Sequence, residues 1–159
     1  MRTTPPLALA STAVHATLAA MGPALWEIAG GRSAIRAVLE DFYAHVFADV
    51  MIGYLFRNAD KTRLIEKELE LTMNALGADV AYTGRPVRDV HRPLPIMGGH
   101  FMRRRKLLLD AIERASIPAG VREAWLAHTD ALRADVTPDA SGECDAPEAA
   151  ARARTTPGE

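Results

Sequence analysis

The residues best suited to chemistry lie in the segment 82–96, which reads YTGRPVRDVHRPLPI. It presents one histidine, His91, followed by two prolines that end any helix and stiffen the chain beyond it. Leu94 and Ile96 place apolar surface next to the imidazole. An imidazole in such surroundings can bind a metal. A lone histidine is more often a partly buried side chain without a special role, since histidine is only intermediate in burial. The segment alone leaves both interpretations open.

Two further polar side chains on predicted helices could act on a ligand. Tyr43 lies next to the apolar stripe of a predicted helix 33–48, so its ring can enter the core while its hydroxyl bonds either a backbone carbonyl or a ligand. Glu68 lies between two leucines on an apolar face of a predicted helix 61–77. It either reaches water or a nearby lysine, or it approaches a ligand. In the second case it would have to be protonated, solvated or paired, because a lone buried carboxylate costs too much.

Apolar residues recur at helical spacing along most of the chain, which predicts the elements that position these side chains. Asp60 can cap the helix 61–77, and Gly77 ends it. A short helix over 24–29 is expected to close at Gly30 and Gly31, and a short segment over 86–91 carries the histidine. Longer helices are predicted over 99–115 and 117–136. No strand pattern and no internal repeat is present, so the predicted fold class is all-α.

A basic run, Arg103 to Lys106, falls within the predicted helix 99–115. Such a run could contact phosphate or RNA, but Phe101 is the only aromatic residue near it and the remaining charge is balanced. We interpret the run as a solvated helix face. The inward line of this helix is predicted to consist of Phe101, Arg105, Leu108, Ile112 and Ala115.

The composition is that of a single domain with enough chain for a core. The sequence has 159 residues, 48% hydrophobic and 25% charged, with a formal net charge of −1, which gives no reason to expect nucleic acid or an acidic membrane as a partner. The only cysteine, Cys144, excludes an internal disulfide. No apolar run approaches the roughly 20 residues of a membrane span, and the N-terminus is a poor signal peptide. We expect a cytoplasmic protein with a flexible segment 1–22, a domain 23–137 and a disordered tail 138–159.

Other site chemistries have little support in the sequence. His91 and His100 are nine residues apart without cysteines or clustered carboxylates, which does not favour a structural zinc site. The two glycine pairs are not preceded by strands and do not form a phosphate-binding loop. A catalytic triad assembled in space stays open.

Four motifs in order carry a resemblance to a known family. They are LWEIAGG at 25–31, EDFYAHV at 40–46, LF at 55–56, and YTG at 82–84 leading to His91. Their order and spacing resemble the truncated haemoglobins, the small bacterial haem globins, and are most similar to the first group of that family. The resemblance covers about residues 25–136 and needs no gap between 30 and 101. It implies a globin-like, two-on-two helical sandwich.

The resemblance also implies a haem site, which needs one strong axial ligand, an apolar slot for the porphyrin and cations near the propionates. His91 would be the axial ligand, and Tyr43 the donor to a ligand on the open side of the iron. Lys67 or Arg92 would reach a propionate, although Lys67 is equally well explained as a solvated lysine. The residues expected to contact the porphyrin are Phe56, Leu64, Leu71, Leu94, Ile96 and Phe101.

Three positions depart from the family pattern. Glu68 stands where first-group relatives often have glutamine, Ala78 where they usually have a second glycine, and Arg104 where they tend to be more apolar. Leu64 falls at the position of the distal histidine of vertebrate globins. These departures leave the ligand preference open.

The expected function is reversible O₂ binding, and binding of NO or CO, by an oxygen-binding or oxygen-transport protein. One alternative is an enzyme at the same iron, an NO dioxygenase or peroxidase-like protein with a redox partner, in which Glu68 acts as an acid or base. The other is a haem-free sensory or interaction module, which Glu68 and Arg104 motivate.

Overall fold

The computed structural model describes residues 22–138. The predicted flexible segment 1–22 and disordered tail 138–159, which contains Cys144, lie outside the described residues except for positions 22 and 138. Every regular element within them is helical, so the all-α prediction is confirmed for this part of the chain. The elements are α2 (Leu25–Ile28), α3 (Gly31–Ala48), the 3-10 helix η1 (Gly53–Phe56), α4 (Lys61–Ala75), α5 (Val87–His91), α6 (Gly98–Arg114), α7 (Ala119–Ala131) and α8 (Arg133–Val136).

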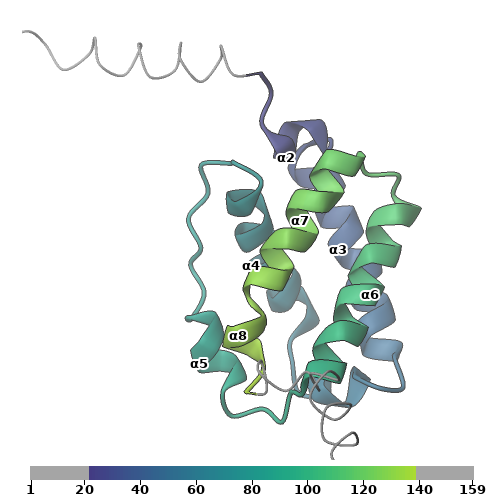
Figure 1. Ribbon diagram of the computed structural model, residues 1–159, viewed down its shortest axis with the longest axis vertical. Coiled ribbons are helices and arrows are strands. Elements are labelled where there is room, and N and C mark those ends of the chain that lie inside the picture. The colour runs from purple at the N-terminus through teal and green to yellow at the C-terminus, as the bar shows by residue number, and fades with distance from the viewer. Residues whose placement is uncertain (1–21, 139–159) are drawn as a thin grey trace, which may run out of the picture.

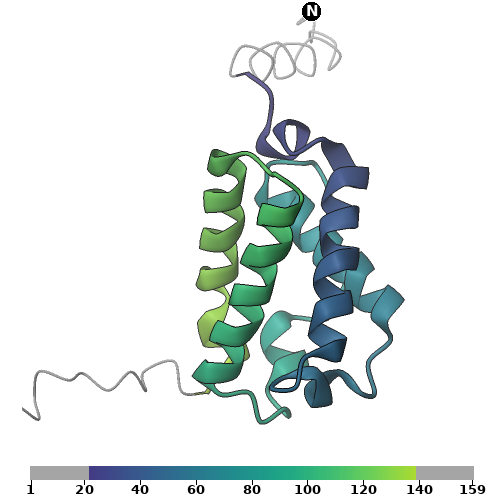
Figure 2. The same cartoon turned by 90° about the vertical axis from the view of Figure 1, so that its right-hand side faces the viewer.

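Four long helices form two pairs that pack on each other. Helix α3 contacts both α4 and α6, and α7 contacts the same two helices from the other side. Figures 1 and 2 show α6 and α7 running side by side, with α3 and α4 behind them in the first view. This is the predicted arrangement of two helices on two. None of the helices in the described part is long and apolar enough to cross a membrane.

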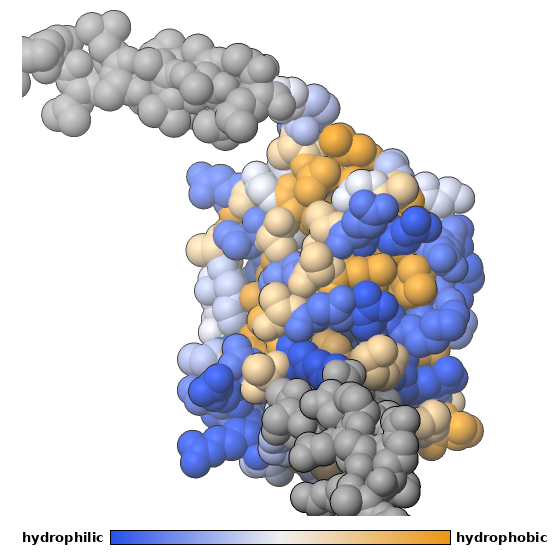
Figure 3. All heavy atoms as spheres, viewed as in Figure 1, coloured by the Kyte–Doolittle hydropathy of each residue, from blue (hydrophilic) through white to orange (hydrophobic). Residues whose placement is uncertain are grey.

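The apolar stripes predicted for the helices form the core. The inward residues of α3 and α4 are buried, and α6 and α7 contribute matching faces. Polar residues mixed with apolar ones cover the face seen in Figure 3. The fully buried side chains include Ile35, Val38, Leu39, Phe42, Val46, Leu69, Leu76, Leu108, Ile112, Val121 and Trp125.

The helix boundaries follow the predicted signals closely. Gly30 and Gly31 both have positive φ, 96° and 81°, and separate α2 from α3. A Cβ atom on Gly30 would lie 2.9 Å from the Cβ of Ala34, so this turn requires glycine in two respects. The carboxylate of Asp60 accepts the backbone N–H of Arg63 at 3.1 Å, which confirms the predicted cap of α4.

The C-terminal helix differs from the prediction. The sequence predicts one helix over 117–136, but it is divided at Leu132 into α7 and α8. The hydroxyl of Thr129 donates to the carbonyl of Trp125, an interaction that bends helices. The backbone N–H of Leu132 then bonds the carbonyl of Thr129, three residues back rather than four. This break lets α8 lie against α5.

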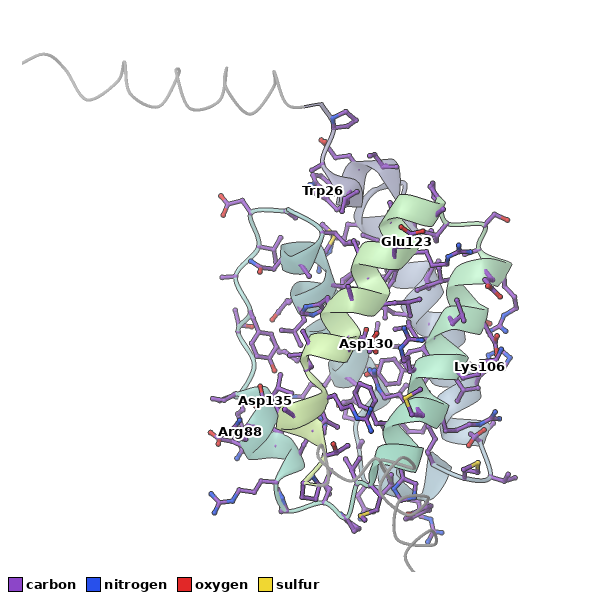
Figure 4. The ribbon with its side chains drawn as sticks, in the orientation of Figure 1. Trp26, Arg88, Lys106, Glu123, Asp130 and Asp135 are labelled. Carbon is purple, nitrogen blue, oxygen red and sulfur yellow. The ribbon has the colours of Figure 1, made fainter. Side chains whose placement is uncertain are left out.

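An ion pair links α8 to α5. Arg88 and Asp135 are 2.8 Å apart, and Figure 4 shows the two side chains adjacent where these helices meet. Helix α5, which carries His91, has no buried residue of its own. Its position therefore depends on its contacts with α8 and on the chain that enters and leaves it.

Asp49 fixes the turn from α3 into η1. Its side chain is 5% exposed and accepts the backbone N–H groups of Met51 and Ile52 at 2.9 and 3.1 Å. It also pairs with Arg103 of α6 at 2.7 Å. The hydrogen bond from Arg103 is the main reason that the pKa of Asp49 is lowered. This arrangement holds η1, which carries Phe56, against α6.

Candidate functional site

The described residues enclose a cavity of about 980 Å³, including its opening to solvent, bounded by α3, η1 and α4 on one side and α5 to α8 on the other. All of the predicted site residues except Leu94 and Arg92 line it. Those that line it are Tyr43, Phe56, Leu64, Lys67, Glu68, Leu71, His91, Ile96 and Phe101.

Leu94 and Arg92 are the exceptions among the predicted site residues. The side chain of Leu94 is 39% exposed, and both residues border a surface hollow that adjoins the cavity and shares His91 and Val136 with it. The turn after α5 directs Leu94 away from the cavity, whereas Ile96, two residues later, is buried and lines the cavity.

His91 is the last residue of α5, and its ring nitrogen Nδ1 lies 2.7 Å from the backbone carbonyl of Val87. A carbonyl oxygen only accepts, so the hydrogen must be on Nδ1, and Nε2 keeps a free lone pair. Burial lowers the pKa of His91, which favours the neutral ring. A neutral imidazole with its tautomer fixed in this way is the form that coordinates a metal ion.

Tyr43 of α3 is 3% exposed, and its ring packs edge-on against Phe42 and Phe56, with centroids 4.8 and 6.4 Å away. Nη2 of Arg104 lies 3.5 Å from its hydroxyl oxygen, where the sequence had suggested a backbone carbonyl or a ligand. Burial and the charge of Glu68 raise the pKa of Tyr43. The hydroxyl therefore keeps its proton at neutral pH and can donate it.

Glu68 forms an ion pair with Arg104, with Oε1 and Nη2 3.0 Å apart and each side chain only 20% exposed. The guanidinium also lies over the ring of Phe42, 4.9 Å from its centroid. Burial alone lowers the pKa of Arg104, but the attraction of Glu68 outweighs it, and the pKa is raised. Of the three states considered for Glu68, the structure shows the paired one.

The interpretation of the basic run as a solvated face is wrong for Arg104, which turns into the cavity. Its neighbours behave differently: Arg105 pairs with Asp130 of α7 at 2.8 Å, and Lys106 pairs with Asp110 on its own helix. Arg105 was predicted on the inward line, but Arg104 takes that place.

Helical spacing does not separate the two arginines. Arg104 lies three residues after Phe101 and four before Leu108, and Arg105 lies four after Phe101 and three before Leu108, so both fit one helix face. Ala115, predicted at the end of the line, is exposed.

Lys67 lies at the edge of the cavity and is already engaged. Its Nζ atom contacts Glu70 at 2.8 Å and also bonds the hydroxyl of Thr83, while the backbone N–H of Thr83 donates to Glu70 at 2.8 Å. Lys67 is the main cause of the lowered pKa of Glu70. The three residues tie α4 to the loop before α5, so Lys67 is not the solvated side chain that the sequence allowed.

Two histidines that the sequence did not single out as cavity residues, His100 of α6 and His128 of α7, also line the cavity. Burial lowers the pKa of His128. His100 contacts the hydroxyl of Tyr54 at 3.4 Å.

Comparison with known proteins shows which family this chain belongs to. A family profile described as bacterial-like globin matches residues 24–138. The group 1 truncated haemoglobin GlbN of Mycolicibacterium paratuberculosis is 34% identical over 95 residues, which are 60% of this chain and 70% of that protein. The chain belongs to the truncated haemoglobin family, in its first group.

Solved truncated haemoglobins share the fold. The protein of Tetrahymena pyriformis, in its Fe(III) form, has a TM-score of 0.67 at 21% identity, covering 72% of this chain and 98% of its own. The haemoglobin of Chloroflexus aurantiacus has a TM-score of 0.64 at 28% identity with the same coverage. The predicted two-on-two globin sandwich is confirmed.

Truncated haemoglobins bind haem and diatomic gases, so the predicted cofactor is confirmed at the level of the family. The cavity residues of this chain fit that cofactor. They supply an imidazole with a free nitrogen, His91, and a predominantly apolar lining.

Proposed function

We propose that this truncated haemoglobin holds haem through Nε2 of His91 and reversibly binds O₂, and also NO and CO, with Tyr43 as the donor to the ligand. The observation that carries the proposal is the 2.7 Å contact between Nδ1 of His91 and the carbonyl of Val87. It leaves Nε2 as the ring nitrogen that can coordinate iron.

The haem supplies an iron that binds a diatomic molecule at the position not taken by the protein. The chain's own residues set the conditions around it. Phe56, Leu64 and Leu71 form one apolar wall, and Ile96 and Phe101 form another, which limits the access of water. Tyr43 holds a proton that it can donate to a polarised ligand. A hydrogen bond of this kind is worth about 1.5–3 kcal/mol, or roughly tenfold or more in affinity.

The outer edge of the site is part of the proposal. Lys67 borders the cavity and Arg92 lies beside the surface hollow with Leu94. Either cation can meet a propionate, and we propose that Leu94 contacts the exposed edge of the porphyrin rather than its face.

The ion pair bears on the two alternatives considered from the sequence only through the roles given there to Glu68 and Arg104. Glu68 was the candidate acid or base of an enzyme, but it is the ion-pair partner of Arg104. Glu68 and Arg104 also motivated a haem-free module, and each neutralises the other's charge. Turnover with a redox partner is separated from reversible binding by measuring NO consumption over many cycles in the presence of a reductase.

The axial assignment is tested by replacing His91 with Ala and titrating the purified full chain with haem. We expect loss of stable haem uptake and of the His-type ferrous–CO absorbance spectrum. His45→Ala is the matched control, because His45 is an exposed histidine of α3 that bonds the carbonyl of Asp41 outside the cavity. A His91→Ala protein with normal haem content and an unchanged spectrum would overturn the assignment.

The role of Tyr43 is tested by Tyr43→Phe, which removes the hydroxyl and leaves the ring. O₂ dissociation should become about tenfold faster, following the hydrogen-bond estimate above. Tyr82→Phe is the control, since Tyr82 also lines the cavity but donates its hydroxyl to the carbonyl of Arg85 at 2.8 Å. Equal dissociation rates for Tyr43→Phe and the unaltered protein would remove Tyr43 from this role.

A further inference from the structure

A single nitrogen atom of Arg104 contacts the two polar groups that approach the ligand side of the cavity. Its Nη2 lies 3.0 Å from Oε1 of Glu68 and 3.5 Å from the hydroxyl oxygen of Tyr43. The three residues come from α6, α4 and α3, so the contact joins three helices. Stacking on Phe42 at 4.9 Å helps to hold the guanidinium in place.

The direction of these hydrogen bonds follows from chemistry. Arginine has five N–H donors and no acceptor. Arg104 can therefore only donate to the oxygen of Tyr43, and the phenol proton of Tyr43 cannot be given to Arg104. That proton is left for another acceptor.

Glu68 is the competing acceptor. A hydrogen bond to a carboxylate is roughly twice as strong as one between neutral groups, so an unpaired Glu68 would take the phenol proton in preference to a diatomic ligand. Burial is the main cause of the raised pKa of the phenol, and the charge of Glu68 and a hydrogen bond to it add to the rise. In the structure, the Glu68 carboxylate accepts from the guanidinium at 3.0 Å, which weakens its competition for the phenol proton.

We propose that Arg104 is a positioning residue of the ligand pocket: it holds the Glu68 carboxylate, and thereby keeps the Tyr43 proton available to the bound gas. This inference rests on the proposed function. It explains why a glutamate can occupy this pocket without removing its hydrogen-bond donor.

The proposal is tested with the haem-loaded full chain, using O₂ dissociation and the stretching frequency of bound CO as readouts. Arg104→Met should accelerate O₂ dissociation about tenfold, as far as Tyr43→Phe does, because the freed carboxylate captures the phenol proton. The CO frequency should shift in the same direction in both variants.

The double variant Arg104→Met with Glu68→Leu decides the mechanism. With no carboxylate to restrain, Arg104 becomes dispensable, and the dissociation rate should return close to that of the unaltered protein. If the double variant stays fast, Arg104 donates to the ligand itself and the proposal is wrong. An unchanged rate in Arg104→Met would also overturn it.

Arg104→Lys keeps a cation beside Glu68 and serves if Arg104→Met does not fold. It should retain slow O₂ dissociation, and fast dissociation in this variant contradicts the proposal. Failure of the proposed function itself is recognised separately, because then Tyr43→Phe has no effect or haem is not bound at all.

Discussion

The Glu68–Arg104 ion pair makes a prediction about stability that does not depend on haem. Replacing either residue alone leaves the other as an uncompensated charge in a largely buried place, whereas replacing both removes the charges together. The single variants Glu68→Leu and Arg104→Met should therefore each clearly lower the free energy of unfolding. Adding the second substitution to either single variant should then lower it by less than the first substitution did.

The burial of the pair sets the magnitude. Exposed ion pairs contribute about 0–1 kcal/mol, and breaking a fully buried one costs about 3–5 kcal/mol. With each side chain 20% exposed, we expect about 2–3 kcal/mol for each single variant, between these limits. Because apolar replacement of a whole buried pair is often neutral, the double variant should cost no more than about one single substitution.

Urea unfolding of the full chain without haem measures these values, with circular dichroism and tryptophan fluorescence required to give coincident transitions. A loss of this size moves the midpoint by on the order of 1 M urea. Arg114 and Asp41 form the control pair, because they are 2.6 Å apart but 45% and 41% exposed. The interaction free energy from their double-mutant cycle should stay below about 1 kcal/mol.

Two results would refute the reasoning. If the effects of Glu68→Leu and Arg104→Met simply add, the two charges do not interact in solution. If each single variant loses no more than the control pair does, the site is solvated and the charges are screened.

Two further predictions concern the scaffold. Arg103 is the main cause of the lowered pKa of Asp49 in the folded protein. As the pH falls, Asp49 is therefore protonated in the unfolded chain before it is protonated in the folded one. The stability that the carboxylate contributes is present above pH 3.8 and is lost as the pH falls below that value. The stability difference between the unaltered protein and Asp49→Asn should shrink over that range in acid titrations, while a constant difference contradicts it. Gly30→Ala should destabilise by about 1–3 kcal/mol, since it combines positive φ with a Cβ 2.9 Å from that of Ala34. In α7, a Cβ atom added at Gly120 would have no atom within 4 Å, so Gly120→Ala should be neutral or stabilising. Equal melting temperatures of Gly30→Ala and Gly120→Ala would contradict this difference between the two glycines.

Local patterns predicted much of this fold. The stripe of α3 and the cap at Asp60 depend on neighbours within one or two helical turns, and both are found as expected. The break at Leu132 was missed because Thr129 also suits a continuous helix, and the bend depends on which acceptor its hydroxyl takes.

The candidate site was predictable in its members but not in its contacts. Glu68 on an apolar stripe of α4 indicated that a charged partner was needed. That partner, Arg104, lies 36 residues later in the sequence, within a run of four basic residues. Single-helix periodicity places Arg104 and Arg105 almost equally well, and only the packing of α6 against α3 and α7 separates them. Lys67 was ambiguous for a similar reason, because Thr83 reaches it from a loop.

The short helix that carries His91 has a consequence for how long a cofactor stays bound. Five residues are too few for a helix to persist by itself, and none of the side chains of α5 is fully buried. Such a segment opens locally at a lower free energy than the whole domain. We expect the residence time of haem to follow this local opening rather than global stability. The ion pair between Arg88 and Asp135 joins α5 to α8, but its side chains are 69% and 38% exposed, so it can slow this opening only slightly, by the about 0–1 kcal/mol of an exposed pair.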